Sequence, residues 1–515
     1  MKIRVLHGTA VGGLLTACFV ATSYLGWKLG GLPFLPFDLF DWVARELPGW
    51  LVTFAIDSGV ALGSVLHVDT IATSAKIVEE TLAIAASIGA GVVAGGALFA
   101  ALAFSDEPAL LFGGVLGAAL GGVALLIERT LDRIAPGALA ASLWVVASCL
   151  LWGFAFGWAY ERLRSTASGP APAFDNDRRR FLVRLAFAIG TPTLLTGIWG
   201  VLIGARRPRT PGARWSDDHE LPNTKAAVRP VPGTRAEFTP LEDHYRIDVD
   251  TRMPTIEPSK WRLRIAGLVE RPRELTLGDL RLEEPLHQFV TLSCISNPIA
   301  GDLIGTTRWT GVSLERVIDR AVPEPRGTHV KIISADGFFE VVSLDLIRSD
   351  PRVMLTYAWD GVPLAMDHGF PLRIYIPDVY GMKQPKWIVA AEVLDRWEPG
   401  YWVTRGWDRD GRMKATSVVD TAKAVLAAPT GEARSLVTVG GIAHAGARQV
   451  SRVEARVDEG PWQQAHLRDP LSDTTWVVWR ADLPATPGEH GVTVRCYEGD
   501  DTPQDGSFHT KRIKI

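Results

Sequence analysis

The first 205 residues are built from long apolar stretches separated by short polar connections. Five windows of 19 to 27 residues contain no charged side chain: 5–27, 81–105, 109–127, 134–160 and 185–205. A helix needs about 20 such residues to cross about 30 Å of hydrocarbon. All five windows are also rich in Gly and Ala, which lets helices approach closely in a membrane. The pattern therefore predicts transmembrane helices rather than the buried helices of a soluble protein.

One stretch in this region, 33–68, does not fit the same pattern. Its second half, 50–68, is apolar but contains Asp57 and His67, and the run FDLFDWVAREL at 37–47 is amphipathic and bounded by prolines. We interpret the stretch as an interfacial or re-entrant piece. The prediction is thus five spans, with six as the alternative.

Basic residues next to the spans predict the orientation. Lys2 and Arg4 precede the first window, and six arginines lie between 162 and 184, before the last window. With five spans the positive-inside rule places both groups in the cytoplasm and residues 206–515 outside it. The run DRRRFL at 177–182 resembles a twin-arginine export signal, which fits a folded, cofactor-carrying domain. Three arginines at 206–209 oppose this orientation.

After residue 205 the pattern changes to short runs bounded by Gly, Pro and Asp. Residues 206–240 are rich in Pro, Arg and Gly without apolar periodicity, and predict a linker. Short strands with an intervening helix at 314–321 then predict an α+β domain, with strands at 261–265, 289–292, 330–333, 353–357 and 372–376. From about 416 alternating runs predict an antiparallel β-sandwich, with strands at 436–439, 451–457, 475–479 and 491–497.

The predicted fold class is therefore multi-domain, with a transmembrane α-helical region, an α+β domain and an all-β sandwich. The predicted boundaries are 1–205 for the helical region, 206–240 for the linker, 241–410 for the α+β domain and 411–515 for the sandwich.

Charge and cysteine content exclude several classes of function. The net charge of −3 provides no global basic field for nucleic acid. Four cysteines without a CxxC pair exclude zinc ribbons, c-type haem attachment and cysteine-ligated iron–sulfur clusters.

One of the four cysteines is a candidate ligand. Cys18 and Cys149 lie in apolar windows and Cys496 in a core strand, where a cysteine is commonly a small filler. Cys294 ends an apolar run and precedes a loop of turn-forming residues, so its thiolate could bind a soft metal in a pocket. From this residue alone, a buried free cysteine remains the alternative.

Four sequence blocks around Cys294 resemble the sulfite oxidase family of molybdopterin-dependent oxidoreductases. The first is FVTLSCISNPIAGDLIGTTRWTG at 289–311, similar to the metal-ligating segment of that family. The others are DHGFPLR at 367–373, YGMKQPKW at 380–387 and Tyr245-Arg246 after the linker. The blocks occur in the family's order within 240–515. Residues 410–515 resemble its immunoglobulin-like domain, which would serve as a dimerisation module.

The resemblance implies a molybdenum cofactor and assigns residues to it. Cys294 would supply the metal's single protein thiolate, and Arg373 and Lys386 the positive charge for the cofactor phosphate. The remaining contacts to the cofactor would come from Tyr245, Arg246, Ser334, His368, Lys383, Gln384 and Pro385.

Two departures from the family pattern bear on the substrate. Trp407 stands where sulfite oxidases have a tyrosine near the metal, and Pro298 onwards replaces arginines that help to bind an anion. Arg246 would remain as the pocket cation, with Arg308 as a candidate second one. The catalytic residues would then be Cys294, Arg246 and Trp407, and sulfite becomes a doubtful substrate.

The sequence predicts a multi-pass membrane protein with an extracytoplasmic molybdenum centre. It would transfer an oxygen atom to or from a small S- or N-containing substrate. Its apolar windows provide too few histidines for haem. Electrons would therefore come from, or go to, a separate quinone, flavin or cytochrome partner. Two alternatives stay open: a catalytically inactive sensor or binding protein on the same scaffold, and a transporter with a regulatory soluble part.

Overall fold

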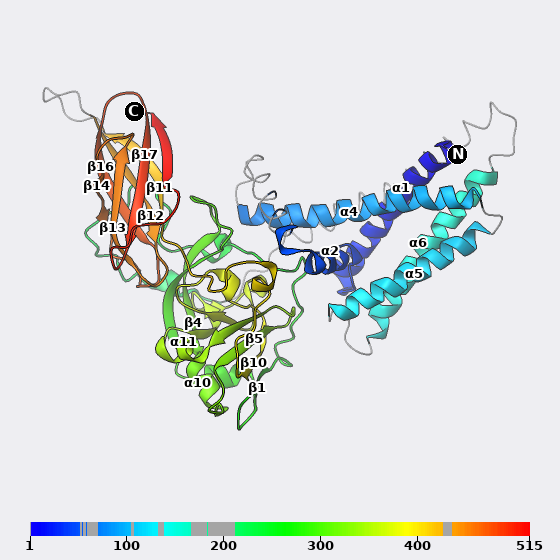
Figure 1. Ribbon diagram of the computed structural model, residues 1–515, viewed down its shortest axis with the longest axis horizontal. Coiled ribbons are helices and arrows are strands. Elements are labelled where there is room, and N and C mark those ends of the chain that lie inside the picture. The colour runs from blue at the N-terminus through cyan, green and yellow to red at the C-terminus, as the bar shows by residue number, and fades with distance from the viewer. Residues whose placement is uncertain are drawn as a thin grey trace. The chain divides into compact units, whose positions relative to one another are not determined.

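The computed structural model divides the chain into two compact units (Figure 1). One comprises Met1–Pro48, Ala75–Arg209 and Asp248–Arg252, and the other comprises Gly49–Ser74, Thr210–Ile247 and Met253–Ile515. The residues whose structure is described are 2–51, 54, 58, 71–104, 108–131, 138–165, 183, 212–425 and 435–514.

The first unit contains four apolar helices of membrane-spanning length. They are α1 (Lys2–Gly30), α4 (Ile71–Leu102), α5 (Ala109–Thr130) and α6 (Leu139–Ser165). Glycines allow α5 and α6 to touch, because a Cβ on Gly113 would lie 2.2 Å from the carbonyl oxygen of Gly153. Four of the five predicted spans are confirmed as helices. The fifth, 185–205, and the arginine run at 177–182 lie outside the described residues, as does most of 50–68.

The amphipathic run between α1 and α4 forms helix α2 (Leu35–Glu46). The polar face of α2 forms hydrogen bonds and an ion pair with the segment Asp248–Arg252, which belongs to the same unit. Asp41 accepts hydrogen bonds from the Thr251 N–H at 2.9 Å and the Thr251 hydroxyl at 2.7 Å. Arg45 pairs with Asp250 at 2.8 Å. The helical pattern of α2 was predictable, whereas its bound segment, about 210 residues further along the chain, was not.

The stretch predicted as a linker is packed where it is described. It contains a short helix, α8 (Trp215–Asp218), and a 3₁₀ turn, η2 (Leu241–Asp243) follows it. Arg235 binds Asp420 through Nε and Nη2, and Glu237 pairs with Arg468 at 2.8 Å. Ion pairs thus hold this stretch against the C-terminal strands.

The domain that follows is α+β, as predicted, and contains two five-stranded sheets. One has the order β2-β1-β10-β5-β6, and the other β3-β4-β7-β8 with β9 paired to β7. Their bounds are β1 Leu263–Gly267, β2 Arg273–Leu275, β3 Leu286–Ser293, β4 Ile304–Ser313, β5 His329–Ser334, β6 Phe339–Ser343, β7 Met354–Trp359, β8 Val362–Pro363, β9 Arg373–Tyr375 and β10 Ile388–Leu394. The short helices are α9 Leu277–Arg281, α10 Leu314–Asp319, α11 Leu344–Ser349, and the 3₁₀ turns η3 Met366–His368, η4 Gly381–Lys383 and η5 Val403–Arg405.

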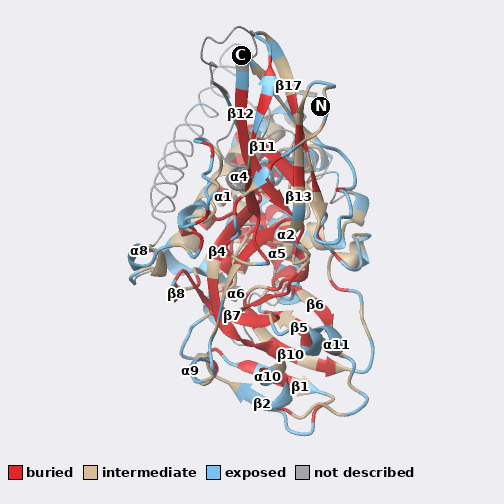
Figure 2. Ribbon diagram, turned by 90° about the vertical axis from the view of Figure 1, so that its left-hand side faces the viewer, coloured by how far each residue is buried: buried red, intermediate tan, exposed pale blue. Residues whose placement is uncertain are grey.

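The C-terminal strands form the predicted β-sandwich. One sheet has the order β11-β12-β16-β15 and the other β14-β13-β17-β18. The bounds are β11 Thr416–Val425, β12 Ser435–His444, β13 Val450–Val457, β14 Gln463–Gln464, β15 His466–Leu467, β16 Val477–Ala485, β17 Glu489–Glu498 and β18 His509–Lys514. Trp479 and Cys496 are fully buried between the sheets, so Cys496 is a core residue as expected. Figure 2 shows long buried stretches in β4 and β12.

Candidate active site around Cys294

Cys294 lies at the first position after β3, in a loop held by its own backbone. Its N–H donates to the Leu303 carbonyl at 2.9 Å, and its carbonyl accepts from the Asn297 N–H at 3.1 Å. The Asn297 side chain accepts from the Leu303 N–H at 2.9 Å and closes the loop. The cysteine is therefore held in one place although it lies outside regular structure.

The thiol of Cys294 is buried, with only 9% of the residue exposed. Burial raises the pKa of the thiol. Hydrogen bonds from the N–H groups of Ile295 and Ser296 and from the Ser296 hydroxyl act in the opposite direction and favour the thiolate. A bound metal cation would favour the thiolate further, because metal coordination keeps a thiol deprotonated.

The two motif blocks at 367–373 and 380–387 lie side by side. The Ile374 N–H donates to the Pro385 carbonyl at 3.1 Å, and the Trp387 N–H to the Gly369 carbonyl at 3.3 Å. The Trp387 indole N–H also donates to the Met366 carbonyl at 2.7 Å. Blocks that are separate in the sequence thus form one wall of the site.

Gly369 is the position at which the two motif blocks of this wall approach each other most closely. Its φ is +105°, and an added Cβ would lie 3.0 Å from the Cβ of Lys386 and 3.2 Å from the Cβ of Arg373. A side chain would strain the backbone and push both basic residues away. The glycine therefore lets Lys386 and Arg373 approach one another.

Positive charge surrounds His368, which is 8% exposed. Burial holds the pKa of its imidazole well below the ordinary value, and His244, Lys386, Arg373 and Arg246 lower it further. The ring of His244 lies 5.7 Å from that of His368, and the lowered pKa keeps His368 neutral at physiological pH. The arrangement is typical of a site that receives an anion.

Two of these basic groups are oriented by the protein itself. Arg373 is 4% exposed and donates to the His368 carbonyl at 3.2 Å, with its guanidinium over the Trp309 ring at 4.5 Å. Lys386 donates to the Ile247 carbonyl at 3.1 Å, immediately after Arg246 in the chain. The block Tyr245-Arg246 is thereby brought to the wall formed by the other motifs.

Tyr245 is packed beside Cys294 in one small apolar cluster. Burial raises the pKa of its hydroxyl, the thiol of Cys294 raises it further, and Arg373 lowers it. The structure therefore brings together Cys294, Tyr245, Arg246, His368, Arg373 and Lys386.

Several buried polar atoms near these residues have no hydrogen-bond partner among the described residues. They include Nε2 of His244, which is 5% exposed, and the indole N–H of Trp359, whose ring lies 4.5 Å from that of His368. The hydroxyl of Ser334, which is 2% exposed, is also unpaired, but Ser334 lies opposite Ile388 in the sheet and no described contact links it to Cys294. Burying an unpaired polar group costs about 1–3 kcal/mol, so such atoms commonly face a ligand or water. Sequence reasoning missed His244; its position directly before Tyr245-Arg246 was the available signal.

Three other predicted cofactor residues have partners within the protein. The ammonium of Lys383 pairs with the buried Glu340 at 2.8 Å. The side-chain amide of Gln384 donates to the carbonyls of Val379 at 2.9 Å and Ile376 at 3.3 Å. The carbonyl of Pro385 accepts from Ile374. In this structure these groups hold the motif loop, and cofactor contact by them stays a prediction.

The two residues named for substrate choice lie in different surroundings. The indole of Trp407 packs on Trp402 with ring centres 5.2 Å apart. The guanidinium of Arg308 lies over the Trp215 ring at 5.0 Å. No described contact links either side chain to Cys294, so their roles also stay predictions.

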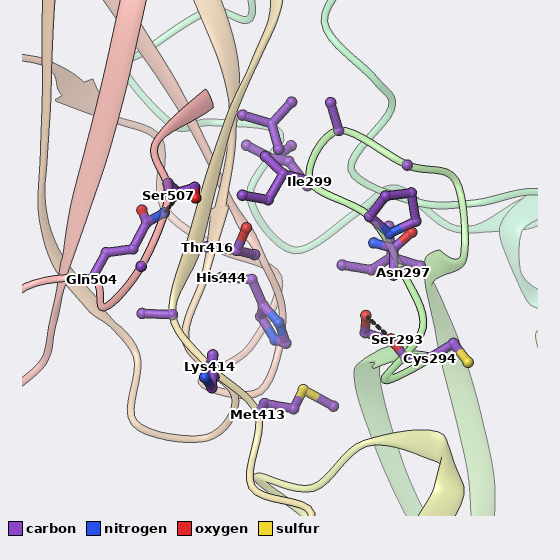
Figure 3. Close-up of a pocket in the computed structure, with 18 of the residues that line it drawn as sticks. Ser293, Cys294, Asn297, Ile299, Met413, Lys414, Thr416, His444, Gln504 and Ser507 are labelled. Atoms are coloured by element: carbon purple, nitrogen blue, oxygen red, sulfur yellow. Dashed lines mark hydrogen bonds between the residues drawn. The ribbon is translucent and has the colours of Figure 1, made fainter. Parts of the chain in front are cut away.

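A cavity of about 280 Å³ opens on the other side of the Cys294 loop (Figure 3). The loop forms one wall, and the first strands of the sandwich form the other. The sulfur of Cys294 points away from His444 and from these strands in Figure 3. Cys294 is nonetheless one of the residues that line this cavity.

The donor set fits a metal bound through one protein thiolate. The described residues contain no group of three or more His, Cys, Asp and Glu that could hold a metal ion by themselves. A metal at Cys294 would then take its other ligands from a cofactor, and a thiolate suits a soft metal. The basic residues around His368 and the unpaired Nε2 of His244, whose ring lies 5.7 Å from that of His368, fit an anionic, polar cofactor at the same place.

Comparison with known proteins agrees with this geometry. Residues 250–402 match the family described as the oxidoreductase molybdopterin binding domain. The sulfite oxidase of Gallus gallus is 31% identical over 46% of this chain and 61% of that protein. The putative protein-methionine-sulfoxide reductase subunit YedZ1 of Azospira oryzae is 27% identical over 45% of this chain and 86% of that protein.

Among solved structures, the sulfane dehydrogenase SoxCD from Paracoccus pantotrophus aligns with 58% of this chain and 86% of that chain, with 19% identity and a TM-score of 0.48.

The matched region is thus a molybdopterin-binding oxidoreductase domain, and molybdenum held by molybdopterin is the cofactor of such a domain. The similarity to sulfite oxidases supports the family that the four sequence blocks predicted. The chain covers 54% to 61% of the length of the vertebrate sulfite oxidases that it matches.

Proposed function

We propose that the protein is a membrane-anchored molybdenum oxidoreductase. It would catalyse a two-electron oxygen-atom transfer on a small S- or N-containing substrate at an extracytoplasmic centre. The observation that carries this proposal is the buried thiol of Cys294, which is held beside Tyr245 and the basic groups around His368. The four apolar helices support membrane anchoring.

Different residues of this chain would bind different parts of the cofactor. Cys294 would bind the metal through its thiolate, and Arg373 and Lys386 would neutralise the phosphate. Tyr245, Arg246, His368 and Ser334 would contact the pterin or the metal pocket, and the loop of Lys383, Gln384 and Pro385 would border it. When bound, the cofactor supplies two-electron redox chemistry with water as oxygen source or product.

The protein's own contribution is placement and a dry, positively charged environment. Burial keeps His368 neutral, so its ring can donate one N–H and accept at the other nitrogen. Arg373 keeps its charge and is oriented by the His368 carbonyl and the Trp309 ring. Charge-assisted hydrogen bonds are strongest where water is excluded, so this wall would orient an anionic group firmly.

The departures from sulfite oxidases favour a neutral or weakly polar oxide over sulfite. The arginines that follow the cysteine in sulfite oxidases are replaced here by Pro298, Ile299 and Ala300. Losing two or three charge-assisted donors of about 1.5–3 kcal/mol each would weaken binding of an oxyanion by several kcal/mol. The relative named as a subunit of a methionine sulfoxide reductase agrees with this preference.

The other features of the proposal concern electrons, assembly and orientation. A separate quinone, flavin or cytochrome protein would exchange electrons with the metal centre, and the sandwich would mediate homodimerisation. A reporter that is active only in the cytoplasm, fused after Ile515, should give no signal. A bright reporter would place the catalytic domain in the cytoplasm and contradict the proposed orientation.

The decisive experiment compares Cys294→Ser with the matched control Cys18→Ser in the full-length protein. The wild type and the control should contain one molybdenum per chain and give a Mo(V) paramagnetic resonance signal on partial reduction. Cys294→Ser should remain folded and lose turnover with an artificial electron carrier. Full activity in Cys294→Ser would refute the assignment. A folded wild type that is free of molybdenum after expression with the cofactor would favour the inactive sensor.

A further inference from the structure

Arg235 brings a positive charge to the cavity beside the Cys294 loop. Its side chain lines this cavity together with Cys294 and residues 298–300. Its Nη1 donates to the carbonyl of Gly301, in the same loop, at 3.3 Å. The arginines that sulfite oxidases have after their cysteine would occupy 298–300, so Arg235 reaches the same space from a distant part of the chain.

The charge of Arg235 is paired with the carboxylate of Asp420 in β11. Nη2 of Arg235 donates to Oδ1 of Asp420 at 2.8 Å, and Nε donates to Oδ1 at 3.0 Å and to Oδ2 at 3.1 Å. The side chains of Arg235 and Asp420 are 24% and 9% exposed. A carboxylate held by two arms of a guanidinium has a fixed geometry. Asp420 therefore cancels most of the positive charge that Arg235 would otherwise present to the cavity.

The other charges around this cavity are also balanced or distant from its surface. Lys414 and Asp505 line the cavity, are both exposed and have opposite signs. Burial lowers the pKa of His444 to about 4, so its ring is uncharged at physiological pH. Lys511 donates to the backbone carbonyl of Asp420 at 2.5 Å and is not among the lining residues. The described lining is thus close to neutral although it contains an arginine.

We propose that Asp420 determines the choice of substrate, because its pairing with Arg235 keeps the cavity neutral and so favours a neutral S- or N-oxide over an oxyanion. An oxyanion that enters a partly buried cavity loses water and needs an unshared positive charge in return. The inference rests on the proposed function, since it concerns the substrate which that site accepts. Asp420 acts through Arg235 and is a positioning residue rather than a catalytic one.

The test uncovers the charge of Arg235 in the full-length protein in detergent. Asp420→Asn keeps the shape of the side chain and one acceptor oxygen but removes the negative charge. The probe is sulfate, whose binding requires no turnover, and its affinity is measured by isothermal titration calorimetry at constant ionic strength. We expect sulfate to bind Asp420→Asn roughly 10- to 100-fold more tightly than the wild type, the range of one charge-assisted hydrogen bond.

Turnover with an artificial electron carrier should change in the same direction. In Asp420→Asn the KM for sulfite should fall, because an uncovered cation binds the substrate and the transition state alike. Dimethyl sulfoxide carries no net charge, so its kcat/KM should stay within about 2-fold of the wild-type value. A purely structural role of Asp420 would weaken turnover of both substrates and would not strengthen the binding of sulfate.

Two further variants are matched controls. Asp420→Glu keeps a carboxylate next to Arg235 and should bind sulfate as the wild type does. The double variant Asp420→Asn with Arg235→Gln has neither charge and should lose the gain in affinity. The pair of results assigns the gain to the guanidinium of Arg235 rather than to a general loosening of the fold.

The proposal is overturned if sulfate binds equally to the wild type and to folded Asp420→Asn, or if the gain persists in the double variant. If Asp420→Asn does not fold, Arg235→Met decides. It uncovers the carboxylate, so the tetramethylammonium cation should bind about 10-fold more tightly than to the wild type, and an unchanged affinity refutes the proposal. A wild type that turns over neither oxides nor sulfite would contradict the proposed function instead, and the sulfate titration would still decide the role of Asp420.

Discussion

The buried ion pair between Lys383 and Glu340 ties the motif loop to the neighbouring sheet. The ammonium and carboxylate are 2.8 Å apart, and the two side chains are 9% and 1% exposed. Lys383 lies in η4 and Glu340 in β6. Lys383→Met keeps the length of the side chain and leaves the carboxylate buried without its partner.

The expected loss of stability is large. Removing one member of a buried pair typically costs about 3–5 kcal/mol. For a domain of this size each kcal/mol lowers the melting temperature by about 2–4 °C, so Lys383→Met should melt roughly 6–20 °C below the wild type. The control is Arg316→Met, which breaks a pair whose side chains are 48% and 74% exposed and should melt like the wild type.

The deficit should also depend on pH. Burial raises the pKa of Glu340, and the charge and hydrogen bond of Lys383 lower it. Without Lys383 that pKa rises further, and the folded state then retains a proton that the unfolded state has released. In the window between the two pKa values stability falls as pH rises. The deficit of Lys383→Met should therefore be largest near pH 8 and shrink toward the ordinary carboxyl pKa.

The assay is thermal unfolding of the full-length protein in detergent, followed by tryptophan fluorescence at several pH values. The double variant Lys383→Met with Glu340→Gln should recover most of the lost stability, because no charge remains buried. A melting temperature of Lys383→Met within about 2 °C of the wild type at pH 8 would refute the reasoning. Lower molybdenum content at unchanged stability would instead support a direct cofactor contact by Lys383.

Three further predictions follow from single positions. Gly369→Ala should strain a left-handed backbone by about 1–2 kcal/mol, displace Lys386 and Arg373, and lower molybdenum per chain; unchanged metal content would contradict this role. Asp41→Ala should leave the buried Thr251 N–H unpaired, cost about 1–3 kcal/mol and lower the melting temperature of the helical unit, whereas an unchanged transition would show that the contact is dispensable. Sulfite should be a poor substrate, and a kcat/KM for it of about 10⁴ M⁻¹s⁻¹ or more with an artificial electron carrier would refute that preference.

The sequence by itself determined the local elements. The apolar windows predicted the four apolar helices α1, α4, α5 and α6, because burial in lipid requires about 20 apolar residues in succession. Alternating runs predicted β12, β13, β16 and β17 because successive side chains of a strand face opposite sides. These signals are local, so they can be recognised in the sequence without knowledge of the tertiary structure. The motif order around Cys294 likewise predicted the family.

Only the tertiary structure decided which residues meet. Lys383 carries the same basic signal as Lys386 in the sequence, yet it pairs with Glu340, 43 residues away, while Lys386 lies near His368. His244 gave no periodic or motif signal, and burial among particular neighbours left its Nε2 without a hydrogen-bond partner among the described residues. The same holds for Thr251 on Asp41. Partner choice depends on contacts between residues distant in the chain, and desolvation sets the charge state only once those contacts exist.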